Sequence, residues 1–145
     1  MNVISTESKS KYHIDFTSPT IDDFSSLRRK AGWGEIDIDM ARNSLAHSLF
    51  HVAVYDLSVL VGMGRVVGDG FMYFYIQDVI VDSDYQGQGI GHILMTKIEC
   101  YLLEVAKKGS TIGLLAAKGK EGFYTRYDYV QRPNNALGNG MCKFI

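Results

Sequence analysis

The chain has 145 residues and a formal net charge of −1, with 46% hydrophobic and 21% charged residues. This length and composition are typical of a globular domain, and they exclude a chain that is disordered throughout. The near-neutral charge provides no overall basic field. We therefore expect neither nucleic acid nor an anionic membrane as a partner.

Residues 1–11 are polar and lack the apolar core of a signal peptide. No apolar run approaches the ~20 residues of a membrane-spanning helix, so the sequence predicts a cytoplasmic protein. Two cysteines, Cys100 and Cys142, are too few for a disulfide scaffold, and we expect two reduced, largely buried thiols. The four histidines lack the spacing of a metal site, so no metal is predicted.

The first third of the chain predicts one strand and two helices. Apolar and polar residues alternate over residues 12–16, as in a half-buried strand. A helix is predicted to start at Ser18-Pro19-Thr20 and to end near Arg28-Arg29-Lys30, with aspartates in its first turn and these cations near its C-terminus. A glycine-flanked loop at residues 32–34 separates it from a second, shorter helix over residues 38–48.

The middle of the chain reads as three consecutive strands. Residues 50–55, 59–67 and 71–81 are rich in β-branched and aromatic side chains. Turn-forming residues at 56–58 and 68–70 separate them. The sequence therefore predicts two successive hairpins.

The last third begins with a strongly apolar helix that starts at Ile90 and ends near Lys107. A strand over residues 111–116 and a short helix over residues 119–126 follow. Residues 127–130 and 141–145 are predicted as the closing strands.

These elements define a mixed α/β fold, and we expect a single domain over residues 1–145. Residues 71–116 form a strand–helix–strand unit. Its two strands should therefore be parallel, with a right-handed connection.

The segment Gln86-Gly87-Gln88-Gly89-Ile90-Gly91 joins the end of a strand to the start of a helix. Its glycines allow a ligand to approach the backbone, and the first amides of the helix lack intrahelical acceptors. Such amides bind a phosphate or diphosphate. The P-loop pattern fails because His92 follows Gly91, and the Rossmann spacing is not matched.

Gln86, Gly89 and Gly91 occupy the fixed positions of the pattern Q/R-x-x-G-x-G/A. This pattern resembles the acetyl-CoA pyrophosphate loop of the GNAT superfamily of N-acetyltransferases. The preceding residues 78–85 look like the central strand and lead-in of that family. Residues 123–129 look like its late F-Y-x-x-x-G-F segment, with Asp128 in place of the glycine.

The resemblance implies the GNAT acyl-CoA N-acyltransferase fold. That fold has a central mixed, mostly antiparallel sheet with helices on both faces and a splayed parallel strand pair that holds CoA. It also implies acetyl-CoA as co-substrate. The implied cofactor-binding residues lie on the central strand and in the glycine turn: Val79, Ile80, Val81, Gln86, Gly87, Gln88, Gly89, Ile90, Gly91 and His92.

The family resemblance implies direct attack of an amine on the thioester, without a covalent enzyme intermediate, so Cys100 is not proposed as a nucleophile. Tyr124 stands at the tyrosine of the late F-Y segment and is the candidate general acid. Asp78 is the candidate base, with a structural or substrate-orienting role as the alternative. Glu35 is a weaker candidate for the base.

The acceptor site of such enzymes is built by the first two helices and the loop between them. This places Trp33, Gly34 and Glu35 in the site, with Arg65 and Asp69 reaching it from the hairpin.

We expect a primary amine of a small molecule as acceptor. Two alternatives are a protein or peptide N-acetyltransferase and a non-catalytic acyl-CoA sensor. The fold is compatible with a homodimer, and the sequence leaves the acceptor and the length of the acyl group open.

Overall fold

The computed structural model describes residues 11–145, and the polar N-terminal segment 1–10 lies outside the described residues. The chain divides into two compact units, one ending at Ile112 and the other comprising Gly113–Ile145. The single domain over residues 1–145 stays a prediction. No helix of the described residues is long and apolar enough to cross a membrane.

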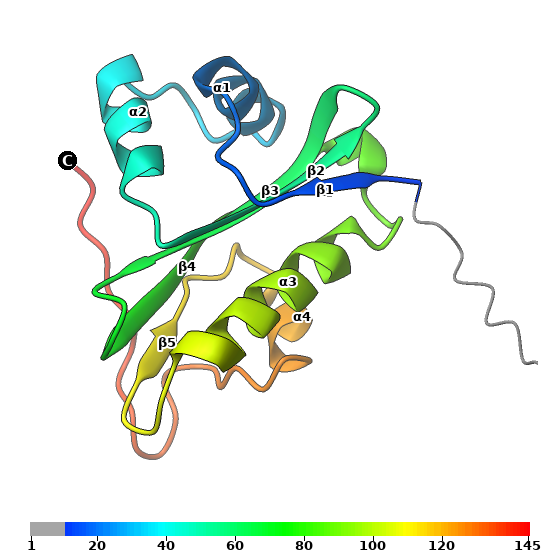
Figure 1. Cartoon of the computed structure of the whole chain (residues 1–145). Helices are drawn as coiled ribbons and strands as arrows, with labels where there is room; N and C mark the ends of the chain where they lie inside the picture. Colours follow the sequence, from blue (N-terminus) through cyan, green and yellow to red (C-terminus); the bar gives the residue numbers. More distant parts are fainter. Residues whose placement is uncertain (1–10) are drawn as a thin grey trace, which may run out of the picture. The chain divides into compact units, whose positions relative to one another are not determined.

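A five-stranded sheet with the order β1-β2-β3-β4-β5 forms the framework (Figure 1). The strands are β1 (His13–Asp15), β2 (Phe50–Asp56), β3 (Val59–Gly68), β4 (Tyr73–Val81) and β5 (Thr111–Gly113). The pairs β1–β2, β2–β3 and β3–β4 are antiparallel. The two predicted hairpins are thus confirmed.

Helix α3 (Ile90–Val105) connects β4 to β5. Thr111, the first residue of β5, donates its N–H to the carbonyl of Met72, which directly precedes β4, at 2.7 Å. The two strands therefore begin at the same end of the sheet, as parallel neighbours do. The predicted mixed, mostly antiparallel sheet is confirmed.

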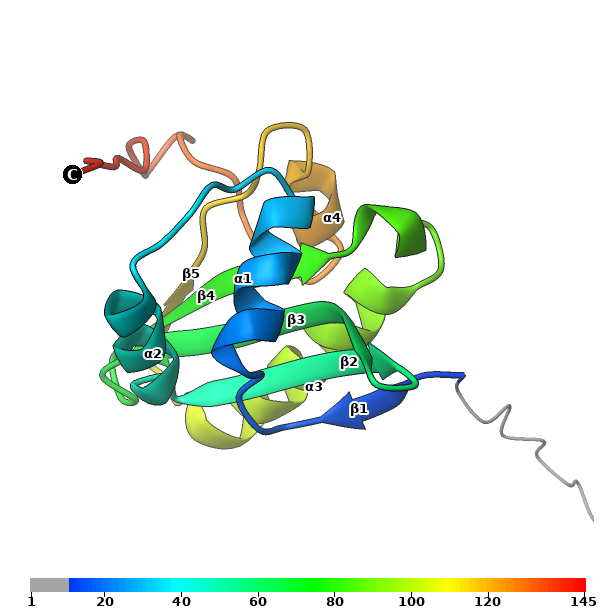
Figure 2. The same cartoon turned by 90° about the horizontal axis from the view of Figure 1, so that it is seen from above.

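Helices α1 (Ile21–Lys30) and α2 (Ile38–Ala46) lie on one face of the sheet, and α3 lies on the other (Figures 1 and 2). The side chain of Thr20 caps α1 by accepting from Asp23 N, and the Asp37 side chain caps α2 by accepting from Met40 N. Both helices therefore start where a polar cap precedes the apolar stripe.

The core between α1, α2 and the sheet is apolar. Its buried members come from both helices and from three strands: Phe24, Leu27, Ala41, Leu45, Ala53, Leu60, Met63 and Ile80. Burial of such side chains stabilises the fold by about 1.5–3 kcal/mol each. On the opposite face, α3 buries Ile90, Leu94, Met95, Ile98 and Leu102.

Two glycines of β3 allow α3 to lie close to the sheet. A Cβ at Gly62 would lie 2.6 Å from Cγ2 of Ile90, and a Cβ at Gly64 would lie 2.9 Å from Cδ1 of Ile98. Both distances are shorter than real Cβ contacts. Glycine is therefore required here for space, not for backbone conformation.

The predicted closing strands 127–130 and 141–145 are wrong. The unit from Gly113 contains helix α4 (Glu121–Thr125) and no strand after it among its described residues. Side chains that a strand would bury are exposed: Val130 by 72%, Met141 by 90% and Phe144 by 92%. Apolar alternation alone does not make a strand where no neighbouring strand accepts its hydrogen bonds.

The prediction of buried thiols is also wrong, because Cys100 and Cys142 are both exposed. Cys100 lies on α3, whose buried stripe includes Ile98 and Leu102. Ile98 and Leu102 are four residues apart and share the buried face of the helix. Residue 100 is two residues from each of them, about half a turn, and therefore points away from the sheet.

Replacement of Gly62 by alanine should destabilise the protein by about 1–3 kcal/mol, because Ile90 must shift to admit the methyl group. Gly122→Ala in α4 is the control, since a Cβ there meets open space. Chemical unfolding of both variants measures the difference. Equal stability of the two variants would contradict the close approach of α3 to β3.

Candidate active site

A β-bulge in β4 sets the geometry of the candidate site. Met63 pairs with Ile80 and Arg65 pairs with Gln77, so Gly64 faces two residues, Asp78 and Val79. Asp78 adopts a left-handed conformation with φ of 54°. A bulge bends the strand and redirects a side chain.

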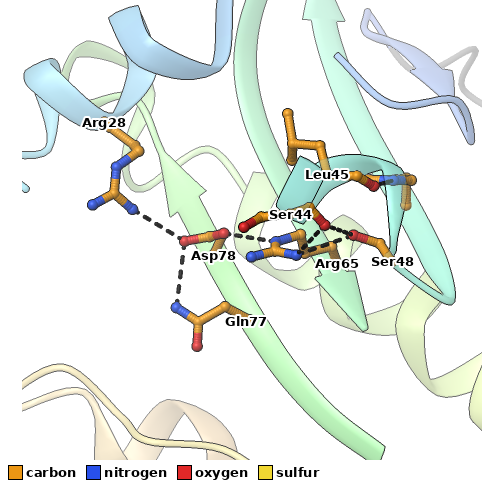
Figure 3. A network of polar contacts seen from close by, with 8 residues as sticks. Arg28, Ser44, Leu45, Ser48, Arg65, Gln77 and Asp78 are labelled. Atoms are coloured by element: carbon orange, nitrogen blue, oxygen red, sulfur yellow. Dashed lines mark hydrogen bonds and ion pairs between the residues drawn. The ribbon is translucent and has the colours of Figure 1, made fainter. Parts of the chain in front are cut away.

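The redirected carboxylate of Asp78 lies between two arginines (Figure 3). Its Oδ1 accepts from Arg28 Nη1 at 3.3 Å and its Oδ2 accepts from Arg65 Nε at 2.7 Å. Gln77 Nε2 adds a long hydrogen bond of 3.4 Å to Oδ1. The side chain of Asp78 is only 2% exposed. These contacts favour the structural alternative for Asp78, and its role as a base stays a prediction.

The last three residues of β4, Val79 to Val81, alternate between the two faces of the sheet. Ile80 is buried in the core under α1 and α2. Val79 and Val81 are half-buried, and Val79 Cγ2 would lie 3.6 Å from a Cβ at Gly64, on the face that α3 covers. The Ile80 side chain is thus used in the core, so its backbone groups are what it has left for the predicted pantetheine contacts.

Two glycines of the glycine turn have a left-handed backbone. Gly87 and Gly89 have φ of 77° and 83°, and a Cβ at either would meet no atom within 4 Å. Glycine is therefore required here for conformation. Helix α3 starts at Ile90 after Gly89, and no side chain caps it. Amides of its first turn therefore face an uncapped end, as an anion site requires.

Side chains from distant parts of the chain hold this turn. The hydroxyl of Tyr12 donates to Oε1 of Gln88, and the hydroxyl of Tyr85 donates to Asp56 at 2.7 Å. No motif in the sequence connects Tyr12 with the glycine turn, which lies 76 residues later. The Gln88 side chain is thus directed toward the first strand.

The buried Asp82 anchors the lead-in to the turn. It accepts from the N–H of Asp84 at 3.0 Å and from Lys30 Nζ at 2.9 Å. Burial acts to raise the pKa of Asp82, but the hydrogen bond from Asp84 and the Lys30 ammonium outweigh it, so the pKa is lowered. Asp82 is therefore ionised near neutral pH and ties the turn to α1. His92 lies exposed in the first turn of α3.

The loop between α1 and α2 contacts Arg28. The Arg28 guanidinium carbon lies 5.5 Å from the ring centroid of Trp33 and 5.7 Å from that of Phe24. Its Nη2 donates to the Trp33 carbonyl at 3.2 Å. Trp33 is 38% exposed, and Gly34 has φ of 75°. The structure thus brings Trp33 and Asp78 to one arginine that the sequence did not single out.

The remaining predicted acceptor residues lie in different surroundings. Arg65 Nη1 donates to Ser44 O and to Ser48 Oγ, both at 3.1 Å (Figure 3). Glu35 is exposed and pairs with the exposed Arg29 at 3.5 Å. Asp69 accepts the N–H groups of residues 71–73 within its own turn. Asp69 is therefore used locally.

Tyr124 lies on α4 in the second unit, with its ring centroid 5.0 Å from that of Phe123. Burial raises the pKa of the Tyr124 phenol, so the hydroxyl is protonated near neutral pH. Its role as general acid stays a prediction. Asp128 has φ of 68°, so it takes the left-handed conformation that the family's glycine adopts easily. Asp is among the few residues that accept it.

Among residues 11–145, no group of three or more His, Cys, Asp or Glu side chains is placed to hold a metal ion.

Comparison with known proteins identifies the family. The model of the acetyltransferase (GNAT) domain matches residues 26–144, so the chain belongs to the GNAT acetyltransferase family. It is 26% identical over 136 residues to the uncharacterised N-acetyltransferase ycf52 of Porphyra purpurea, covering 91% of this chain and 77% of that protein.

Solved structures agree. SA2161 of meticillin-resistant Staphylococcus aureus, a probable acetyltransferase, is 31% identical with a TM-score of 0.84; the match covers 92% of this chain and 99% of that one. The GNAT family protein SP0256 of Streptococcus pneumoniae is 28% identical with a TM-score of 0.75. The match covers 92% of this chain and 98% of that protein.

Replacement of Asp128 by valine should destabilise the protein by about 1–2 kcal/mol, because a β-branched residue is strained at positive φ. Asp128→Gly, which restores the family's residue, should change stability by less than about 1 kcal/mol. Thermal unfolding of the two variants gives the comparison. A valine variant as stable as the glycine variant would show that the turn is not left-handed.

Proposed function

We propose that this protein transfers the acetyl group of acetyl-CoA to a primary amine of a small molecule. The observation that carries the proposal is the glycine turn. In a chain of this family, Gly87 and Gly89 take left-handed conformations directly before an uncapped helix. This donor set suits a diphosphate.

In this proposal, residues 86–91 and His92 hold the diphosphate of acetyl-CoA. Backbone groups of Val79, Ile80 and Val81 would hold the pantetheine arm on the edge of β4 that faces away from β3, since Ile80 and Val81 are paired with β3 on the other edge. The Ile80 side chain is buried in the core, so its contribution to cofactor binding would come from the backbone.

The chemistry proposed is direct transfer in a ternary complex. The neutral amine attacks the thioester carbonyl, a C–N bond forms, and the C–S bond breaks. The departing thiolate takes a proton from the Tyr124 hydroxyl, and solvent returns a proton to the resulting phenolate before the next turnover. The excess proton of the new amide nitrogen leaves to a base or to water.

Asp78 has two arginine partners, and these contacts support a positioning role in the proposed enzyme. Through Arg28 it orients the loop that carries Trp33. The absence of nucleic-acid or membrane partners also remains a proposal, which rests on the near-neutral charge of the chain. A cytoplasmic location stays a prediction.

Replacement of Gly89 by valine should weaken CoA binding at least about tenfold, because valine disfavours the left-handed backbone that presents the amides. Gly109→Val is a matched control, since Gly109 also has positive φ and open space for a Cβ. Isothermal titration with CoA measures both variants. Wild-type protein that fails to bind millimolar CoA would overturn the proposed function.

Replacement of Tyr124 by phenylalanine should lower kcat by about 10²–10⁴-fold, the usual contribution of a general acid, with unchanged CoA affinity. Tyr73→Phe is the control, because Tyr73 is 58% exposed at the start of β4. Thiol release with acetyl-CoA and a panel of amines gives the rates. An unchanged kcat would remove Tyr124 from the mechanism, and CoA binding without any turnover would favour the sensor alternative.

A further inference from the structure

Arg28, Arg65 and Asp78 form a cluster, here called the arginine cluster, in which two cations share one carboxylate. Three other ion pairs match one cation with one carboxylate each: Arg29 with Glu35, Lys30 with Asp82 and Arg42 with Asp39. The arginine cluster thus carries one positive charge in excess.

This excess charge lies in a poorly hydrated place. The side chains of Arg28 and Arg65 are 14% and 11% exposed, and that of Asp78 is 2% exposed. An arginine remains charged under all ordinary conditions, so it cannot relieve the burial by losing its proton. A buried charge without a counter-charge costs free energy, which an anion bound at the cluster would offset.

No acidic residue of the loop between α1 and α2, or of α2, supplies the negative charge that would balance the arginine cluster. Glu35 pairs with Arg29, Asp37 caps α2, and Asp39 pairs with Arg42. The positive charge of Arg65 also affects the nearby His51. Burial lowers the pKa of His51, the hydrogen bond to the Leu45 carbonyl acts in the opposite direction, and the charge of Arg65 lowers it further.

The cluster also has more donors than acceptors. Arg28 donates from Nη1 to Asp78 and from Nη2 to Trp33, while its Nε is buried without a partner among the described residues. Arg65 uses Nε and Nη1. A guanidinium presents five N–H donors in a fork that matches planar anionic oxygens. Because Arg28 Nε is buried, acceptor atoms from outside the chain would use the N–H groups of the terminal guanidinium nitrogens that these contacts leave over.

The geometry points to an acceptor amine that carries an anionic oxygen group, a carboxylate or a phosphate, which binds to Arg28 and Arg65. This inference rests on the proposed function and deepens it. Arg28 contacts the carbonyl and ring of Trp33 in the loop expected to line the acceptor site. An anion at Arg28 would therefore lie beside that loop and fix the orientation of the amine.

Matched pairs of amines test the inference. 4-Aminobutyrate is compared with 4-aminobutyramide, and O-phosphoethanolamine with ethanolamine, by kcat/KM at saturating acetyl-CoA. We expect the anionic member of at least one pair to be preferred about tenfold or more, as a charge-assisted hydrogen bond provides. The pair that shows the preference tells carboxylate from phosphate. The absence of a preference in both pairs overturns the inference.

Replacement of Arg28 by glutamine should bring the ratio of kcat/KM for the anionic amine to kcat/KM for the neutral amine close to one. The change should come from a higher KM for the anionic amine, with the KM for acetyl-CoA unchanged. Arg28→Lys keeps the charge without the fork and should retain part of the preference. It also serves as the second variant if the glutamine variant does not fold. Arg42→Gln removes an exposed arginine from a comparable ion pair and is the control. A preference that survives Arg28→Gln overturns the inference.

Titration of the same pairs into the CoA-bound protein separates this inference from the proposed function, because it requires no turnover. Preferred binding of the anionic amine without acetyl transfer supports the anion site and contradicts the proposed transfer. Acetyl transfer without an anionic preference supports the proposed function and contradicts the anion site.

Discussion

The β-bulge opposite Gly64 is the constraint on which the candidate site depends. One additional residue in β4 places Asp78 in a left-handed conformation and directs its carboxylate toward the face that carries α1 and α2. There it meets Arg28 from α1 and Arg65 from β3. A single backbone irregularity thus connects both strands of the hairpin to the loop that follows α1.

Glycine has two different functions in this chain, and they belong to different parts of the site. Gly62 and Gly64 provide space, because a Cβ at either position would collide with α3. Gly87 and Gly89 have open space around them and instead supply positive φ. The first pair sets how closely α3 approaches the sheet, and the second pair presents the amides at the start of that helix.

The departure from the family pattern at Asp128 follows the same logic. The family's glycine is absent, yet the backbone retains positive φ at this position. Aspartate tolerates the left-handed region better than most residues, so the turn after α4 persists without glycine. A changed residue therefore does not imply a changed turn.

The sequence by itself determined most of the helices and strands and indicated the family. Periodicity and capping residues located α1, α2 and α3, and the turn residues located the two hairpins, because these signals act within a few residues. The glycine turn was predicted for the same reason. Local patterns failed at residues 127–130 and 141–145, where a strand requires a neighbouring strand.

Only the tertiary structure decided which distant side chains meet. Arg28 is joined to Asp78 across 50 residues and Tyr12 to Gln88 across 76, and no local pattern encodes either contact. Contacts of this kind depend on strand register and on the bulge, and one residue of shift redirects every side chain.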